Sequence, residues 1–239
     1  MKILSIGNSF SQDAQRYLHK IAESAGVPLE TTNLYIGGCR LSLHHEHMMS
    51  GARAYEQEQN GVGTGKRVSI LEALESDAWD VVTLQQQSSS SADYGTFQPY
   101  LNDLAAYVRD KAKGARLALH QTWAYAEESE KLFVTGHGTH GAMFDRIRDS
   151  YDRAMKDSAA DLLIPCGETM RILSESGFVV HRDGFHASRG LGRFALALTW
   201  LGRLTDVDLS TVCFDAFDTP VSEEQYAAAI AAAESALDL

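Results

Sequence analysis

Short apolar runs alternate along the chain with longer segments in which apolar residues recur every three or four positions. The short runs have the length and β-branched content of buried strands, whereas the longer segments have the period of amphipathic helices. We predict strands at residues 2–7, 29–37, 79–85, 116–123 and 161–165. We predict helices at about residues 11–25, 98–113, 141–159, 189–203 and 222–237.

This alternation indicates the fold class. Strands separated by helices are typical of parallel βαβ units, in which helices cover both faces of an open sheet. We therefore expect an α/β fold, with a central parallel five-stranded sheet inside a three-layer α/β/α sandwich. Residues 44–70 are polar and glycine-rich, and we expect a small excursion or a hairpin there. No repeat or long linker interrupts the sequence, so we expect one domain over residues 1–239.

The composition excludes several classes of protein. Of 239 residues, 44% are apolar and 22% are charged, values that do not fit collagen-like, disordered or disulfide-scaffold chains. Lys and Arg number 21 against 32 Asp and Glu, so the formal net charge is −11. Such a balance argues against a surface that neutralises phosphates, and more weakly against anionic membranes. We expect neither nucleic acid nor membrane as a partner, and nothing in the sequence indicates an oligomeric state.

Cysteine usage and the first residues bear on location. The three cysteines are far apart and form no Cys-x-x-Cys pair, which is typical of a reducing compartment. The first residues carry one positive charge and too short an apolar run for a signal peptide. The longest strongly apolar stretch, residues 194–202, is far shorter than a membrane span. We expect a cytoplasmic protein.

A serine follows the first predicted strand, in the segment Gly7-Asn8-Ser9-Phe10-Ser11. A serine between a buried strand and a helix can act as a nucleophile, because the helix N-terminus offers free N–H groups to a developing oxyanion. Taken alone, the segment is more often only a helix cap. A dinucleotide-binding loop is not supported, because the Gly-x-Gly-x-x-Gly pattern is absent.

A second polar segment, Asp183-Gly184-Phe185-His186, precedes the predicted helix at 189–203. A nucleophilic serine needs a base, and the base needs an orienting group. A carboxylate three residues before a histidine can bond one imidazole nitrogen and leave the other free to face Ser9. In isolation, such a pair is more often a surface aspartate beside an unrelated histidine.

Together, in this order and at these strand ends, the two segments resemble the SGNH hydrolase superfamily, also called GDSL-like lipases and esterases. The similarity covers most of the chain in outline and is to a divergent bacterial branch. It implies a flavodoxin-like fold with Ser9 as nucleophile, His186 as base and Asp183 as orienting carboxylate. The family's oxyanion glycine is matched after the second strand by Gly38, which would donate together with the N–H of Ser9. Asn8 stands where the family usually has aspartate.

At the end of the third strand the sequence differs from the conserved pattern of the SGNH hydrolases. Members of that superfamily usually end the third strand with Gly-x-Asn-Asp, and the asparagine donates to the oxyanion. Here the strand continues into Leu84-Gln85-Gln86-Gln87-Ser88. Alignment places Gln87 at the asparagine position, but Gln85 is a second candidate, since a glutamine amide can donate the same hydrogen bond.

Other clusters carry weaker signals. His44-His45-Glu46-His47 could place two histidines on one helix face, but it lacks the His-Glu-x-x-His pattern of zinc enzymes. The glycine-rich residues 61–67 only mimic a phosphate-binding loop, because Asn60 and Arg67 replace required residues. We expect no metal and no cofactor.

Side chains near the predicted strand ends indicate the substrate. Gln121, Trp123, Tyr94 and Arg40 are candidate contacts, and this polar and aromatic set favours a hydroxyl-rich substrate over a long lipid chain. We expect a serine esterase that removes short acyl groups, in particular acetyl, from a carbohydrate. The alternatives are a thioesterase or lysophospholipase with the same residues, a non-catalytic carbohydrate-binding protein and, more distantly, a metal-dependent hydrolase. The negative net charge and the lack of a cationic anchor favour a neutral substrate, with Arg40 and Arg182 as possible exceptions.

Overall fold

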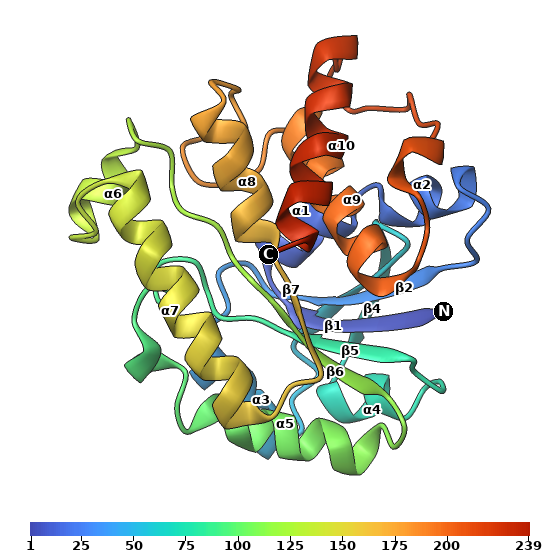
Figure 1. Cartoon of the computed structure of the whole chain (residues 1–239). Coiled ribbons are helices and arrows are strands. Elements are labelled where there is room, and N and C mark those ends of the chain that lie inside the picture. The colour runs from blue at the N-terminus through green and yellow to red at the C-terminus, as the bar shows by residue number, and fades with distance from the viewer.

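The computed structural model describes residues 1–239 and contains one sheet of seven strands in the order β4-β3-β2-β1-β5-β6-β7 (Figure 1). The strands are β1 (Lys2–Gly7), β2 (Glu30–Tyr35), β3 (Tyr55–Gln59), β4 (Val62–Val68), β5 (Val81–Leu84), β6 (Arg116–His120) and β7 (Leu162–Ile164). Strands β2, β1, β5, β6 and β7 are parallel, so their carboxyl ends meet at one edge. The predicted α/β class and all five predicted strands are confirmed, within a few residues at each end.

The two additional strands, β3 and β4, lie in the irregular segment 44–70. They form an antiparallel hairpin that pairs with β2. The turn residues Asn60 and Gly61 both have positive φ, 51° and 76°, as the favoured two-residue hairpin turns require. The strands read Tyr-Glu-Gln-Glu-Gln and Val-Gly-Thr-Gly-Lys-Arg-Val, and β4 is almost wholly exposed. An exposed edge hairpin has no continuous apolar run, so hydrophobicity alone predicts five strands rather than seven.

Helices cover both faces of the sheet. One face carries α1 (Ser9–Gln15), α2 (Leu18–Ser24), α8 (Cys166–Glu175), α9 (Leu191–Leu204) and α10 (Glu223–Leu237). The other carries α3 (Leu41–Ser50), α4 (Ile70–Leu74), α5 (Tyr100–Lys111) and α7 (His140–Ser158), and α6 (Glu130–Val134) lies beside α7 (Figure 1). Each face of the sheet packs against its helices in a separate hydrophobic core. Successive strand residues alternate between these two cores, so that Ile3 belongs to one and Leu4 to the other. Both cores share the one sheet, and the single domain over 1–239 stays a prediction.

The predicted helices were placed well except for the first. Residues 11–25 form two helices, α1 and α2, which are separated at Arg16 and Tyr17. The buried Tyr17 hydroxyl accepts the N–H of Asp218 at 2.8 Å, so the break packs against the C-terminal segment. Short helices α3, α4, α6 and α8 were not predicted. None of the helices combines the length and the apolarity needed to cross a membrane.

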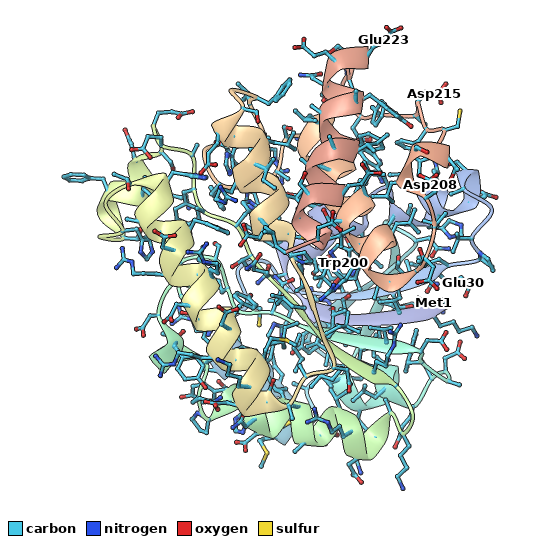
Figure 2. The ribbon with its side chains drawn as sticks, viewed as in Figure 1. Met1, Glu30, Trp200, Asp208, Asp215 and Glu223 are labelled. Carbon is cyan, nitrogen blue, oxygen red and sulfur yellow. The ribbon has the colours of Figure 1, made fainter.

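Five histidines are buried, and for three of them, His44, His120 and His181, burial shifts the pKa strongly. Burial lowers the pKa of His44 and of His120 to about 3, and that of His181 to about 4, from an ordinary value of 6.5. His120 packs edge-on against Trp200 of α9, whose fully buried side chain lies between that helix and the sheet (Figure 2). All three side chains are therefore neutral at neutral pH.

We predict that acidification from pH 7 to pH 5 destabilises the fold. The unfolded chain binds protons at these histidines below about pH 6.5, whereas the folded protein excludes them down to about pH 4 or below. Each such histidine lowers the free energy of unfolding by about 1.4 kcal/mol per pH unit across that window. Urea unfolding at both pH values should give a free energy several kcal/mol lower at pH 5. Equal values would contradict the neutral, buried state.

Candidate active site

The carboxyl ends of β1, β2 and β5 surround a pocket of about 360 Å³. Ser9 begins α1 directly after β1, Gly38 follows β2, and Gln87 follows β5. His186 closes the pocket from the loop before α9. Because parallel strands point their carboxyl ends to the same edge, three segments far apart in sequence meet in one place.

His186 lies between Ser9 and Asp183. Its Nε2 is 2.9 Å from Ser9 Oγ, and its Nδ1 is 2.7 Å from Asp183 Oδ2. The other carboxylate oxygen accepts the backbone N–H of His186 at 2.8 Å. Gly184 has φ +81°, and a Cβ there would lie 2.7 Å from Ser129 Oγ, so this bend requires glycine. With Nδ1–H donating to the carboxylate, Nε2 is free to accept the serine proton.

Asp183 is suited to this orienting position. Burial alone would raise its pKa, but hydrogen bonds from the His186 side chain and from the N–H groups of His186 and Phe185 outweigh that effect and lower the pKa from 3.8. The carboxylate is therefore ionised at neutral pH. An ionised carboxylate on Nδ1 favours a positively charged imidazole whenever Nε2 takes up a proton.

The helix cap at this turn is Asn8, not Ser9. Asn8 Oδ1 accepts the N–H of Phe10 at 3.0 Å, and Ser11 Oγ accepts the N–H of Asn8 at 3.1 Å, which completes a capping box. A Cβ on Gly7 would lie 2.1 Å from Ser11 Oγ, so only glycine permits this close turn. With the cap supplied by its neighbours, the Ser9 hydroxyl is free to face His186.

The second predicted oxyanion donor, Gly38, also lines the pocket, and its N–H donates to no atom of the protein. Asn8 holds the loop that carries it: Asn8 Nδ2 donates to the carbonyl of Cys39 at 2.9 Å. The position of Gly38 relative to Ser9 is therefore fixed, although 28 residues lie between them in the sequence.

The two candidate glutamines differ in position. Gln87 lines the pocket, and while its Oε1 accepts from Ser89 at 2.7 Å, its Nε2 has no partner in the protein. Gln85 is buried beneath the pocket: its Nε2 donates to Asn8 Oδ1 at 2.7 Å, and its Oε1 accepts Nδ1–H of His120 at 2.8 Å. Of the two, only Gln87 lines the pocket, and the expectation that Gln85 faces it is corrected, because Gln85 bridges Asn8 and His120 in the interior.

A buried carboxylate joins the histidine loop to the nucleophile helix. Asp13 lies one turn beyond Ser9, and its side chain is completely inaccessible to solvent. It pairs with Arg182 at 2.8 Å and with Arg193 at 2.8 Å. Arg182 directly precedes Asp183, so this cluster holds the loop of His186 against α1. It also means that Arg182 does not offer its charge to the pocket.

The four expected substrate contacts lie outside the pocket. Trp123 is fully buried, stacks on Phe10 with ring centroids 3.8 Å apart, and donates to the carbonyl of Phe185 at 2.8 Å. It therefore packs behind the segments of Ser9 and His186 and does not face the pocket. Tyr94 bonds Asp157 on α7.

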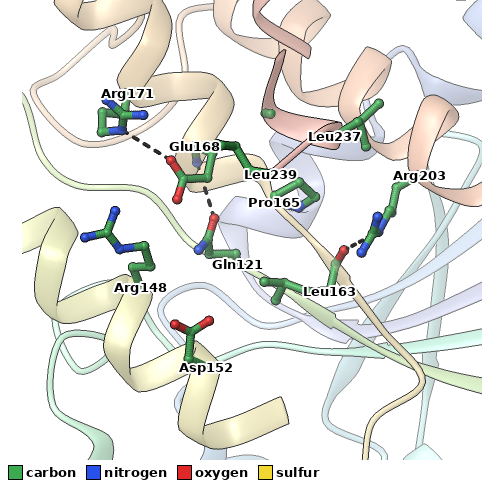
Figure 3. A pocket seen from close by; sticks show the side chains of 11 residues that line it. Gln121, Arg148, Asp152, Leu163, Pro165, Glu168, Arg171, Arg203, Leu237 and Leu239 are labelled. Atoms are coloured by element: carbon green, nitrogen blue, oxygen red, sulfur yellow. Dashed lines mark hydrogen bonds and ion pairs between the residues drawn. The ribbon is translucent and has the colours of Figure 1, made fainter. Parts of the chain in front are cut away.

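Arg40 and Gln121 line other cavities. Arg40 is exposed and lines a shallow depression over α3 and α5. Gln121 is buried in a separate cavity of about 390 Å³ between α7 and α8, where it accepts the N–H of Glu168 at 3.3 Å (Figure 3). The chain after β6 stays buried between the cores, so residues 121–126 do not reach the pocket.

Other side chains in the pocket were missed by sequence reasoning, among them Tyr35 at the end of β2 and Lys131 on the short helix α6. Neither stands in a motif, and α6 has too few residues for a clear period. The histidine cluster gives no ligand set: His44 bonds the hydroxyl of Tyr55 at 2.8 Å and His45 pairs with Asp103 at 3.1 Å.

We predict that Gln85→Leu destabilises the protein by about 1–3 kcal/mol, because it leaves the buried Nδ1–H of His120 without an acceptor and removes a donor to Asn8. The matched control is Gln87→Leu, which breaks no buried hydrogen bond and should change the free energy of unfolding by less than about 0.5 kcal/mol. Urea unfolding of both variants measures the difference. Equal stability of the two variants would contradict the bridging role of Gln85.

Comparisons with known proteins show which solved structures have a similar fold. A Bacteroides uniformis protein of the DUF4886 family is 31% identical with a TM-score of 0.92, covering 99% of this chain and 94% of its own. A Slackia heliotrinireducens protein assigned to the SGNH hydrolases is 26% identical with a TM-score of 0.63, covering 86% of this chain and 99% of its own. An acetyl xylan esterase, 13% identical with a TM-score of 0.57 over 86% of this chain and all of its own, shares the fold.

These likenesses support the SGNH hydrolase superfamily that the sequence blocks resemble. None of the curated proteins compared with the chain matches it. A family described as a domain of unknown function (DUF4886) matches residues 2–236, which is nearly the whole sequence. The chain therefore belongs to the DUF4886 family.

Proposed function

We propose that this protein is a serine esterase that removes short acyl groups, in particular acetyl, from a carbohydrate. The observation that carries the proposal is the position of His186, within hydrogen-bond distance of both Ser9 and the ionised Asp183. A serine, a histidine and a carboxylate in this order form the arrangement that activates a hydroxyl for acyl transfer. The SGNH-type fold is consistent with it.

In the proposed reaction, Ser9 Oγ attacks the ester carbonyl while His186 Nε2 takes the serine proton. The negative charge that forms on the carbonyl oxygen accepts hydrogen bonds from the N–H groups of Ser9 and Gly38 and from Gln87 Nε2. When the intermediate collapses, the C–O bond to the alcohol breaks and His186 gives its proton to the departing oxygen. Water then attacks the acyl-enzyme with His186 as base, which releases the acid and restores Ser9.

The pocket favours a short acyl group. Apart from Phe10, Tyr35 and Phe185, its lining is polar or glycine, and it offers no long apolar groove for a fatty chain. The acetyl xylan esterase that shares the fold is named for an acetylated polysaccharide. A thioesterase or lysophospholipase using the same residues would instead prefer long acyl chains, so the acyl-length profile separates these functions.

We predict that Ser9→Ala lowers kcat for p-nitrophenyl acetate by about 10³-fold or more, because it removes the nucleophile. Stability should change little, since the cap of α1 is Asn8 rather than Ser9. Wild type should cleave the acetyl ester much faster than the octanoyl ester and should react covalently with a fluorophosphonate at Ser9.

The matched control is Ser50→Ala, an exposed serine at the end of α3. It should retain full turnover. Undiminished ester cleavage by Ser9→Ala would rule out this mechanism, and a protein that binds glycans without turnover would be a carbohydrate-binding protein instead.

We also predict that Gln87→Leu lowers kcat by about 10²–10³-fold, the usual effect of removing one oxyanion donor. The affinity for substrate should change less, because the hydrogen bond is strongest to the charged oxygen of the transition state. Steady-state kinetics with p-nitrophenyl acetate measures both, and Gln57→Leu on the β3 hairpin serves as the control. A change in KM alone would show that Gln87 contacts the substrate but does not stabilise the oxyanion.

A further inference from the structure

One ammonium group stands out among the residues around Ser9. Lys131 is the only lysine or arginine that lines the pocket, and no aspartate or glutamate lines it. Tyr35, which also lines it, stays neutral, because burial and the nearby Glu58 raise the pKa of its hydroxyl. A protein of net charge −11 therefore places an isolated positive charge beside its candidate nucleophile.

The ammonium of Lys131 is not neutralised by the protein. It makes no ion pair and lies 3.8 Å from the ring centroid of Phe185. Of the acidic residues on its own segment, Glu127 accepts the N–H of His140 at 2.6 Å, while Glu128 and Glu130 do not line the pocket. The guanidinium groups near the loop behave differently, since Arg182 and Arg193 are both paired with Asp13.

The position of Lys131 indicates which part of a substrate it would meet. Phe185 packs on the His186 ring with centroids 3.9 Å apart, and Lys131 lies over Phe185. In the proposed mechanism His186 protonates the departing alcohol, so the alcohol must lie beside His186. The charge of Lys131 is thus on the side of the alcohol.

We infer that the alcohol part of the substrate carries an anionic group, a carboxylate as in an acetylated uronic acid, which pairs with Lys131. This inference rests on the proposed esterase function and names its substrate class. The net charge of −11 disfavours anions at long range, but such repulsion is screened by salt over about 8–10 Å, whereas a pair formed in contact is screened less. The neutral substrate expected from the net charge is thereby replaced by an acidic one.

The experiment compares two acetyl esters of nearly equal size, 4-acetoxybenzoate, which is an anion, and 4-acetoxybenzamide, which is neutral. The ratio of their kcat/KM values is measured for wild type and for Lys131→Gln, so that differences in intrinsic reactivity cancel. The ratio should fall by about 3–10-fold in Lys131→Gln, and further in Lys131→Glu, as expected for a partly exposed charge pair. Added salt should reduce the wild-type ratio. Lys20→Gln, an exposed lysine on α2, is the control and should leave the ratio unchanged.

The outcomes separate the two proposals. If both esters are cleaved in a Ser9-dependent way but Lys131→Gln keeps the wild-type ratio, the anionic substrate is ruled out and the esterase function stands. If neither ester is cleaved in a Ser9-dependent way, both proposals are overturned. Acetylated galacturonate compared with acetylated galactose should repeat the same preference on sugars.

Discussion

The arrangement of the site depends on one buried amide, that of Asn8. Its oxygen accepts from Phe10 and Gln85, and its nitrogen donates to the carbonyl of Cys39, so one side chain joins the ends of β1, β5 and β2. An unpaired amide in a dry interior is costly, so all of these bonds must form together. The position of Ser9 relative to Gly38 follows from this constraint. An aspartate at this position could not donate to the carbonyl of Cys39 when ionised.

A second constraint positions the loop that carries His186. The loop that carries Asp183 and His186 has no regular structure, yet Asp13 on α1 holds it through Arg182. Because Asp13 is fully buried and paired with two arginines, its loss would leave uncompensated charge in the core. Ser9 and the loop of His186 are therefore both held by α1, the helix that Asn8 caps. Trp123 fills the space behind them and bonds the loop at Phe185.

Much of the fold could be predicted because strands buried on both faces read as continuous apolar runs. Strand β5 shows this: its side chains alternate between the two cores, and all four of its residues are buried, Val81, Val82, Thr83 and Leu84. The hairpin β3–β4 lacked that signal because its outer strand is exposed. The substrate contacts were misplaced for a related reason: Trp123 follows a strand end, but no local pattern shows that the chain there remains between the cores.

The sequence by itself determined the parallel strands of the core and the segments that hold Ser9, Gly38, Asp183 and His186, because strand periodicity and short motifs are local properties. The order of the strands in the sheet came from the tertiary structure. The tertiary structure alone decided between the glutamines. Gln85 directly follows β5, and its side chain is bonded to Asn8 in the interior. Gln87 lies two residues further on, where the alternation of side chains between the two faces of the sheet no longer applies, and it lines the pocket. The tertiary structure also decided the charge of the pocket. Lys131 lies on α6, far from Ser9 in the sequence, and the net charge of a protein does not show where one ammonium group lies.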